Sequence, residues 1–127
     1  MTPASILLVE DEFLVAAFLA RALRMHGYEV VGPHATVAAA LEAIADPNVT
    51  LQGAVLDLAL KAGETSIPIA AALAEREIPF TFLTGDDTLL QNMAALPGGS
   101  PPVMIKPVSL ARLIKRVESF AAPVMRH

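Results

Sequence analysis

The stretch Ser5-Ile-Leu-Leu-Val-Glu-Asp-Glu12 decides the fold, because a short apolar run in it ends abruptly at three consecutive acids. A run of this length, made of Ile, Leu and Val, is typical of a parallel strand that is buried on both faces of a sheet. The acids that follow are rarely buried without a partner, so the chain is expected to leave the sheet there. The stretch therefore predicts a buried strand that delivers a cluster of carboxylates to one edge of a sheet.

Four further apolar runs have the same character, and longer stretches with helical spacing separate them. The other predicted strands lie at residues 28–31, 53–58, 78–83 and 103–105. The predicted helices lie at residues 13–25, 37–45, 66 to about 77, 88–96, and 109 to about 122. Gly32-Pro33 is expected to break the chain after the second strand, and Thr36, Ser66 and Ser109 are suited to act as helix N-caps.

The alternation of five strands with five helices, without a repeat or a linker, predicts a single α/β domain. Its core is expected at about residues 5–122 of the 127. General rules for this class imply a three-layer, doubly wound domain with a parallel sheet, right-handed crossovers and helices on both faces. Periodicity alone leaves the order of the strands open.

The composition excludes several classes of protein. The chain is 54% apolar and has a net charge of −4, with Lys and Arg scattered, whereas nucleic-acid binding needs a basic face. There is no cysteine, which excludes a disulfide framework, a thiolate metal site and a Cys nucleophile. The longest apolar run, residues 13–20, is far shorter than the ~20 residues of a membrane span. With no secretory signal visible either, we expect a soluble cytoplasmic domain.

Polar side chains stand at the ends of four predicted strands. Glu10 and Asp11 follow the first strand, Asp57 lies at the end of the third, Thr84 follows the fourth and Lys106 follows the fifth. Ligands of open α/β sheets bind at the carboxyl ends of the strands, so we expect these groups to converge on one rim. Clustered carboxylates bind a cation or share protons, and an all-oxygen set suits Mg²⁺. A carboxylate beside Mg²⁺ can attack phosphorus, while a lysine and a hydroxyl hold phosphoryl oxygens, so the set predicts phosphoryl transfer.

Together these residues resemble the site of response-regulator receiver domains, and the resemblance covers essentially the whole chain. The matching residues are the acidic pair Glu10 and Asp11, the phosphoacceptor Asp57, the switch hydroxyl Thr84 and the Lys-Pro pair Lys106-Pro107. The resemblance implies a flavodoxin-like sheet with the strand order 2-1-3-4-5. It also implies a cis peptide bond between Lys106 and Pro107.

The resemblance further implies how the site works. Mg²⁺ would be held by Asp11, Asp57 and the backbone carbonyl of Ala59. Two roles stay open for Glu10: it could lie beside the metal, or it could be a solvated acid. A sensor histidine kinase or a histidine phosphotransfer protein would donate a phosphoryl group to Asp57. The domain would catalyse only its own phosphorylation and dephosphorylation, and it is not expected to be an enzyme in any other sense.

A narrower resemblance is to the FAT GUY subgroup of receivers, which are mostly stand-alone domains. It rests on Pro79-Phe-Thr-Phe-Leu-Thr-Gly85 and Gly63-Glu-Thr-Ser66, and on Val103 where other receivers carry an aromatic switch residue. The motif is half kept, since Leu83 replaces an alanine and Asp86-Asp87 replace its last two residues. No output domain is expected, so the domain would bind a partner or serve as a phosphate relay or sink. A weak homodimer stays open.

Two other functions compete with this one. A degenerate receiver would be a docking module that works without phosphorylation, and the extra carboxylates of Asp86-Asp87 favour it. A haloacid-dehalogenase-like phosphatase also uses an Asp nucleophile, but it needs a second carboxylate two residues later, where this chain has Ala59. The same small side chain cannot orient an attacking water, so autodephosphorylation is expected to be modest. In purely structural terms, Asp57 would cap a loop and Asp11 the first helix.

Overall fold

The strands of the sheet follow the order β2-β1-β3-β4-β5, and every neighbouring pair is parallel, which confirms the expected topology. The computed structural model describes residues 4–85 and 103–120. The strands are β1 (Ser5–Val9), β2 (Glu29–His34), β3 (Gly53–Asp57), β4 (Phe80–Thr84) and β5 (Val103–Ile105). The α-helices of the described part are α1 (Phe13–Met25), α2 (Val37–Ala45), α3 (Ile67–Glu75) and α5 (Leu110–Phe120), and a 3₁₀ turn, η1 (Lys61–Gly63), precedes α3.

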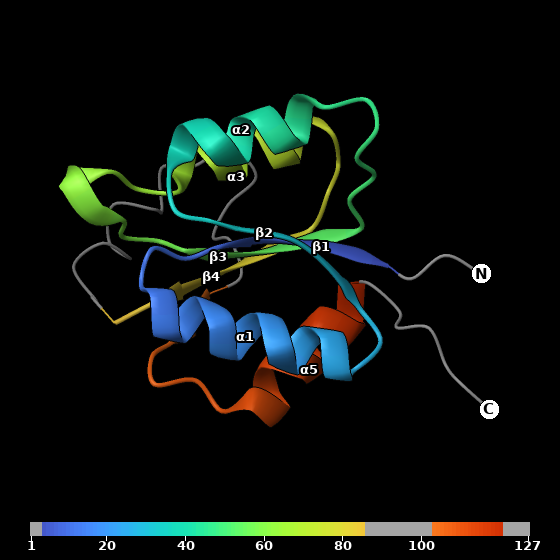
Figure 1. Ribbon diagram of the computed structural model, residues 1–127, viewed down its shortest axis with the longest axis vertical. Helices are drawn as coiled ribbons and strands as arrows, with labels where there is room; N and C mark the ends of the chain where they lie inside the picture. The colour runs from blue at the N-terminus through green and yellow to red at the C-terminus, as the bar shows by residue number, and fades with distance from the viewer. Residues whose placement is uncertain (1–3, 86–102, 121–127) are drawn as a thin grey trace.

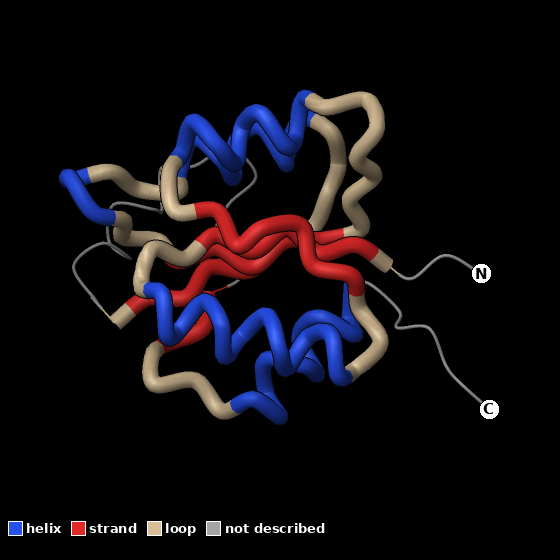
Figure 2. Tube along the Cα trace, in the orientation of Figure 1, coloured by secondary structure: helices blue, strands red, loops and turns tan. Residues whose placement is uncertain are grey.

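Helices cover both faces of the sheet and give the expected three layers (Figures 1 and 2). One face carries α1 and α5, and the other carries α2 and α3. Each face has its own apolar core. Ile6 and Leu8 of β1 pack in the core beneath α1 and α5, whereas Leu7 and Val9 pack in the core beneath α2 and α3. This burial on both faces explains why β1 is an uninterrupted apolar run.

Several predicted elements have the observed bounds. The structure confirms the helices at residues 13–25 and 37–45 and the short strand at residues 103–105. The Thr36 side chain accepts a hydrogen bond from the backbone N–H of Ala39 at 3.2 Å, which is the expected cap of α2. Ser109 caps α5 in the same way, because its hydroxyl oxygen accepts from the backbone N–H of Arg112 at 3.2 Å. Local sequence signals were therefore sufficient to predict the bounds of these elements and their N-caps.

The predicted break of the second strand at Gly32-Pro33 is wrong. Strand β2 continues through this pair to His34, and the pairing register with β1 shifts between Leu7 and Val9. The chain accommodates the irregularity because Gly32 has φ +108°, a conformation that L side chains rarely adopt. A Cβ atom there would lie 2.8 Å from the Leu8 carbonyl oxygen. The pair therefore bulges the edge strand and does not end it.

The boundary between α3 and β4 also differs from the prediction. The Ile78 backbone N–H donates to the Leu73 carbonyl at 2.9 Å, so Ile78 closes the end of α3 and does not begin β4. Glu77 has φ +57° and so leaves the helical path, which is why α3 ends at Glu75 and not near residue 77. Strand β4 starts two residues beyond Ile78, at Phe80.

Two features of the sequence lie outside the described residues: the helix predicted at 88–96 and the pair Asp86-Asp87. The last helix was expected to run to about residue 122, and its described part ends at Phe120. Among the described residues, no helix combines the length and the apolar character that crossing a membrane requires.

Candidate functional site

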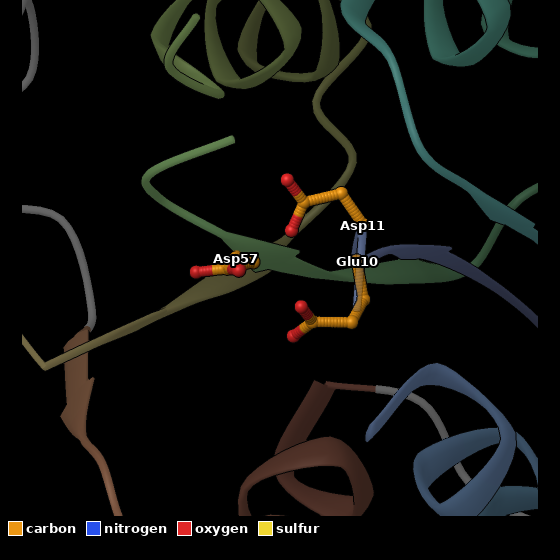
Figure 3. A group of neighbouring side chains, drawn as sticks. All are labelled: Glu10, Asp11 and Asp57. Carbon is orange, nitrogen blue, oxygen red and sulfur yellow. The ribbon is translucent and has the colours of Figure 1, made fainter. Parts of the chain in front are cut away.

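The carboxylates of Glu10, Asp11 and Asp57 meet at the carboxyl edge of the sheet, as the sequence predicts (Figure 3). Glu10 and Asp11 follow β1, and Asp57 is the last residue of the adjacent strand β3. One oxygen atom from each of the three lies within 4.8 Å of the others. Figure 3 shows the Glu10 carboxylate directed toward the side of α1 and α5 and that of Asp11 toward the side of α2 and α3. The cluster therefore sits across the edge of the sheet.

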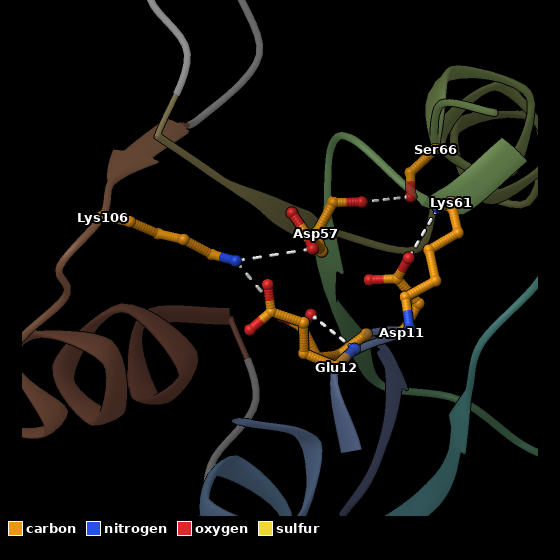
Figure 4. A network of polar contacts seen from close by, with 7 residues as sticks. Asp11, Glu12, Asp57, Lys61, Ser66 and Lys106 are labelled. Atoms are coloured by element: carbon orange, nitrogen blue, oxygen red, sulfur yellow. Dashed lines mark hydrogen bonds and ion pairs between the residues drawn. The ribbon is translucent and has the colours of Figure 1, made fainter. Parts of the chain in front are cut away.

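Lys106, which follows the edge strand β5, joins the cluster at the same carboxyl edge of the sheet (Figure 4). Its Nζ atom lies 3.3 Å from Oε2 of Glu10 and 3.4 Å from Oδ2 of Asp57. Glu10 is 2% exposed and Asp57 is 7% exposed, so both acids lie in a largely water-free environment. The ammonium group offsets part of their charge, as a buried carboxylate requires. The peptide bond between Lys106 and Pro107 is cis, as expected.

The electrostatics of the site make Asp57 a weaker acid than an ordinary aspartate. Burial, together with the neighbouring carboxyl group of Glu10, raises the pKa of Asp57 to about 7, although Lys106 opposes this change. Burial lowers the pKa of Lys106, but the charges of Asp57 and Glu10 outweigh burial and leave that pKa above its ordinary value. One ammonium group is thus too little positive charge for two buried carboxylates and the neighbouring Asp11.

Asp11 is held by the loop between β3 and α3. Its Oδ2 atom accepts a hydrogen bond from the backbone N–H of Lys61 at 2.6 Å (Figure 4). The same loop is closed by the Leu60 N–H donating to the Glu64 carbonyl at 2.8 Å. The Glu64 carboxylate in turn accepts from the backbone N–H of Val37 at the start of α2, at 3.4 Å. One carboxylate oxygen of Asp11 is therefore committed to the loop, while the other faces the cluster.

Ser66 supports Asp57 from behind, and the sequence prediction holds only for its position, since Ser66 is the N-cap residue of α3 but does not cap the helix with its side chain. The expected N-cap of α3 makes no side-chain capping bond. The fully buried hydroxyl group instead donates a hydrogen bond to the backbone carbonyl of Asp57 (Figure 4). This contact fixes the point where the chain leaves β3. No local sequence signal could show it, because the loop must first fold back over the strand end.

Solved structures of other proteins share this fold over nearly the whole chain. SdrG from Sphingomonas melonis Fr1 is 36% identical, with a TM-score of 0.74, and the match covers 94% of this chain and 98% of SdrG. The HemR receiver domain from Leptospira biflexa is 26% identical over 98% of both chains, with a TM-score of 0.75. A response regulator receiver protein from Sinorhizobium medicae shares the fold, with a TM-score of 0.79 at 22% identity.

The chain belongs to the response-regulator receiver domains. The transcriptional regulatory protein PrrA of Mycobacterium tuberculosis is 29% identical over 122 residues, which are 94% of this chain and 51% of PrrA. The chain thus spans about half the length of the curated relatives it matches. No family model matches it.

Two further predicted site residues flank the cluster in this receiver. Thr84 is buried at the end of β4, and its backbone carbonyl accepts a hydrogen bond from the Lys106 N–H at 2.8 Å. Ala59 lies two residues beyond Asp57, where it is exposed and forms an isolated bridge with Thr65. Its role as a metal ligand through its carbonyl, like the switch role of Thr84, stays a prediction.

The donor set of this receiver fits Mg²⁺. The side chains that could hold a cation offer oxygen atoms alone, from Asp11 and Asp57 with Glu10 beside them. A hard cation such as Mg²⁺ binds through one or two carboxylates and keeps several waters. The excess negative charge of the cluster and the raised pKa of Asp57 are what such an ion would relieve.

Proposed function

We propose that this receiver domain accepts a phosphoryl group from a phosphohistidine onto Asp57, as a single-domain response regulator in a two-component system or phosphorelay. The observation that carries the proposal is the setting of the Asp57 carboxylate. It is buried at the end of β3, 3.4 Å from the ammonium group of Lys106 and within reach of the Asp11 carboxylate. A structural cap would need neither a lysine ammonium beside it nor a second and third acid.

The chemistry follows from these groups. An oxygen of the Asp57 carboxylate attacks phosphorus, forming a P–O bond, while the P–N bond to the donor imidazole breaks and the freed nitrogen takes up a proton. Lys106 is placed to neutralise the charge of the phosphoryl oxygens. Mg²⁺, held by Asp11, Asp57 and the carbonyl of Ala59, would supply further charge neutralisation. Asp57 must be ionised to attack, and a nearby cation favours the ionised form.

The switch would act through the backbone contact between β4 and β5. The Lys106 N–H already donates to the Thr84 carbonyl at 2.8 Å, so a shift of either residue moves both strand ends. We expect the phosphoryl group to draw the Thr84 hydroxyl and the Lys106 ammonium inward. The phosphoryl group contacts these two residues only in the inward arrangement, so its presence shifts the equilibrium from the outward to the inward state.

The surface beside the site suits a protein donor. Phe13 and Leu14 begin α1 directly after the acidic run and are 83% and 79% exposed. Exposed large apolar side chains that lie together mark interaction surfaces. Their position at the mouth of the site supports a kinase or phosphotransfer protein as the donor. The proposal extends to a cytoplasmic domain that signals by binding a partner or passes its phosphoryl group on.

Membership of the FAT GUY subgroup is part of the same proposal. Its support is Phe82 and Thr84 on β4, followed by Gly85, and the absence of an aromatic residue at Val103 on β5. Without an aromatic ring on β5, the signal from Thr84 would pass through the backbone pairing of β4 and β5.

The test is intact-mass analysis after incubation with acetyl phosphate, with and without Mg²⁺. We expect the wild type to gain one phosphoryl group in the presence of Mg²⁺, and Asp57→Asn to gain none. Asp46→Asn is the matched control, because Asp46 is an exposed acid at the end of α2, away from the cluster, and it should label like the wild type.

Each other outcome points to a different function. Labelling that persists in Asp57→Asn would place the phosphoryl group elsewhere and refute the assignment. Absence of an adduct both from acetyl phosphate and from phosphorylated kinase would favour a phosphorylation-independent docking module. Steady release of phosphate without an adduct would favour a phosphatase, despite Ala59 in the place of the second carboxylate.

A further inference from the structure

The loop between β3 and α3 closes on itself through backbone hydrogen bonds. The Leu60 N–H donates to the Glu64 carbonyl at 2.8 Å, and the Ser66 N–H donates to the Leu58 carbonyl at 2.9 Å. The 3₁₀ turn η1 lies at the tip of the loop, where Ala62 has φ +61°, a left-handed conformation that is costly for a residue with a Cβ atom. Such a conformation persists only where contacts from outside hold it.

Two carboxylates connect the tip of this loop to other elements. Asp11 accepts a hydrogen bond from the backbone N–H of Lys61 at 2.6 Å (Figure 4). The Glu64 carboxylate extends to α2 and accepts from the backbone N–H of Val37 at 3.4 Å. The Glu64 N–H in turn donates to the Lys61 carbonyl at 3.3 Å. A continuous path of hydrogen bonds thus runs from Asp11 through Lys61 and Glu64 to Val37.

The start of α2 gives the Glu64 carboxylate a firm attachment. The first turn of this helix contains no acid, and the Thr36 cap is bonded to the N–H of Ala39, so Glu64 meets a different N–H group, that of Val37. A carboxylate at this end of a helix is stabilised by the unpaired N–H groups and by the helix dipole. Glu64 therefore ties a strained loop to a rigid element.

We propose that Glu64 is a positioning residue for the cation site, which acts through Lys61 and Asp11. By tying the loop to α2, Glu64 keeps the Lys61 N–H in place, and this N–H holds one oxygen of Asp11 while the other faces the cluster. A carboxylate that is already oriented binds a cation more tightly, because less ordering accompanies binding. The inference rests on the proposed function, since it takes Asp11 as a ligand of Mg²⁺.

The first test is the affinity for Mg²⁺, measured by isothermal titration calorimetry at a salt concentration that screens exposed charges. Glu64→Ala should bind Mg²⁺ about fivefold more weakly than the wild type, less than the ~10-fold that follows loss of a residue bonded directly to a metal ligand. Glu64→Gln keeps an acceptor oxygen for the Val37 N–H without the charge, so it should bind like the wild type. Glu42→Ala is the matched control, because Glu42 is an exposed acid farther along α2, and it should also bind like the wild type.

The second test follows the path without any metal. NMR of the ¹⁵N-labelled chain in EDTA measures the exchange of the Val37 amide hydrogen with water. This exchange should be about threefold faster in Glu64→Ala, since an exposed hydrogen bond protects only weakly. It should also be faster in Asp11→Ala, although Asp11 lies at the other end of the path. The double variant should exchange no faster than Glu64→Ala, because both changes interrupt one path. Mg²⁺ should slow the exchange in the wild type, because coupling between two sites is reciprocal.

Three results would overturn the inference and leave the proposed function standing. These are an unchanged affinity of Glu64→Ala for Mg²⁺, an equal loss of affinity in Glu64→Gln, which would show that the charge of Glu64 acts and not its hydrogen bond, and unchanged exchange of the Val37 amide in Asp11→Ala. A wild type without measurable affinity for Mg²⁺ would refute the metal site of the proposed function and the inference with it. Failure of the positioning path and failure of the cation site are therefore seen in different measurements.

Discussion

The balance of charge around Asp57 is the main energetic feature at the scale of single residues. Two buried carboxylates face one ammonium group, and the contact with Lys106 is shared between Asp57 and Glu10. A site with this imbalance stores the energy of carboxylate repulsion, which a cation or a proton can release. The carboxylate repulsion that destabilises the folded protein thus favours the binding of a positively charged ligand.

The raised pKa of Asp57 predicts how stability depends on pH. The pKa is about 7 in the folded protein and ~3.9 in an unfolded chain, so the folded state binds the proton more tightly. This contribution is fully present below pH ~4 and is lost as pH rises through about 7. Without Mg²⁺, the free energy of unfolding of the wild type should fall relative to that of Asp57→Asn by on the order of 2 kcal/mol between pH 5 and pH 8.

Urea unfolding in EDTA at several pH values measures this difference. Added Mg²⁺ should reverse it, with a larger stabilisation at pH 8 than at pH 6, because the cation competes with the proton. A constant difference between the two proteins from pH 5 to pH 8 would contradict the raised pKa.

Ala59 offers a second prediction at the residue scale. It is exposed two residues beyond Asp57, so a larger polar side chain fits there without disturbing the core. Ala59→Asn should accelerate loss of the phosphoryl group about tenfold, less than the ~100-fold that a fully positioned acid or base supplies, because an amide can orient the attacking water. The measurement is the decay of the adduct by intact mass after removal of the donor. Ala62→Asn, in the same loop but farther along it, should decay like the wild type.

At the scale of elements, the loop between β3 and α3 is what holds the site together. Ser66 donates to the carbonyl of Asp57, and the Lys61 N–H donates to Asp11, so the loop is bonded to two of the three acids. Glu64 also reaches the start of α2. The loop from Lys61 to Ser66 thus connects the acid that follows β1, the end of β3 and the start of α2.

The contact of Ser66 predicts a measurable loss of stability. Ser66→Ala removes a fully buried hydrogen bond and leaves the Asp57 carbonyl without this donor, which should lower the free energy of unfolding by about 1–2 kcal/mol. Ser119→Ala is the control, because that hydroxyl also donates to a backbone carbonyl, of Arg116, but is exposed. Its cost should stay below ~0.5 kcal/mol in the same urea titration. Equal effects of the two variants would show that the Ser66 bond does not stabilise the loop.

The accuracy of the sequence predictions follows the range of the interactions involved. The bounds of α1 and α2 were predicted closely, because their signals are local: a change of periodicity and the Thr36 cap. The carboxylates were predicted as a cluster because parallel strands end at one edge. The bonds of Ser66 and Lys61 were not, because they depend on how a loop closes over the sheet. The path of β2 through Gly32-Pro33 depends on pairing with β1, which no local pattern contains.

At the scale of the whole molecule, one sheet is shared by two apolar cores. Leu23 of α1 and Leu73 of α3 lie in different cores, and both are fully buried. Because β1 and β3 contribute side chains to both faces, neither core can open without exposing strands that the other needs. The domain should therefore unfold as one unit.

This arrangement predicts the behaviour of cavity variants. Leu23→Ala and Leu73→Ala should each lower the free energy of unfolding by about 2–5 kcal/mol, and each should keep a single transition with an unchanged urea dependence. Circular dichroism and the fluorescence of Tyr28 give two probes, of which Tyr28 belongs to the core of Leu23 alone. Probe-dependent midpoints in Leu73→Ala would show that the two faces unfold separately.

The bond from the Lys61 amide to Asp11 also has a practical value. The chain contains no tryptophan, so the indole fluorescence often used to follow ligand occupancy is not available. The Lys61 N–H points at one oxygen of a carboxylate whose charge density would change as soon as a cation binds the other. The chemical shift of this amide proton would therefore report whether a cation occupies the site, and no residue has to be substituted to observe it.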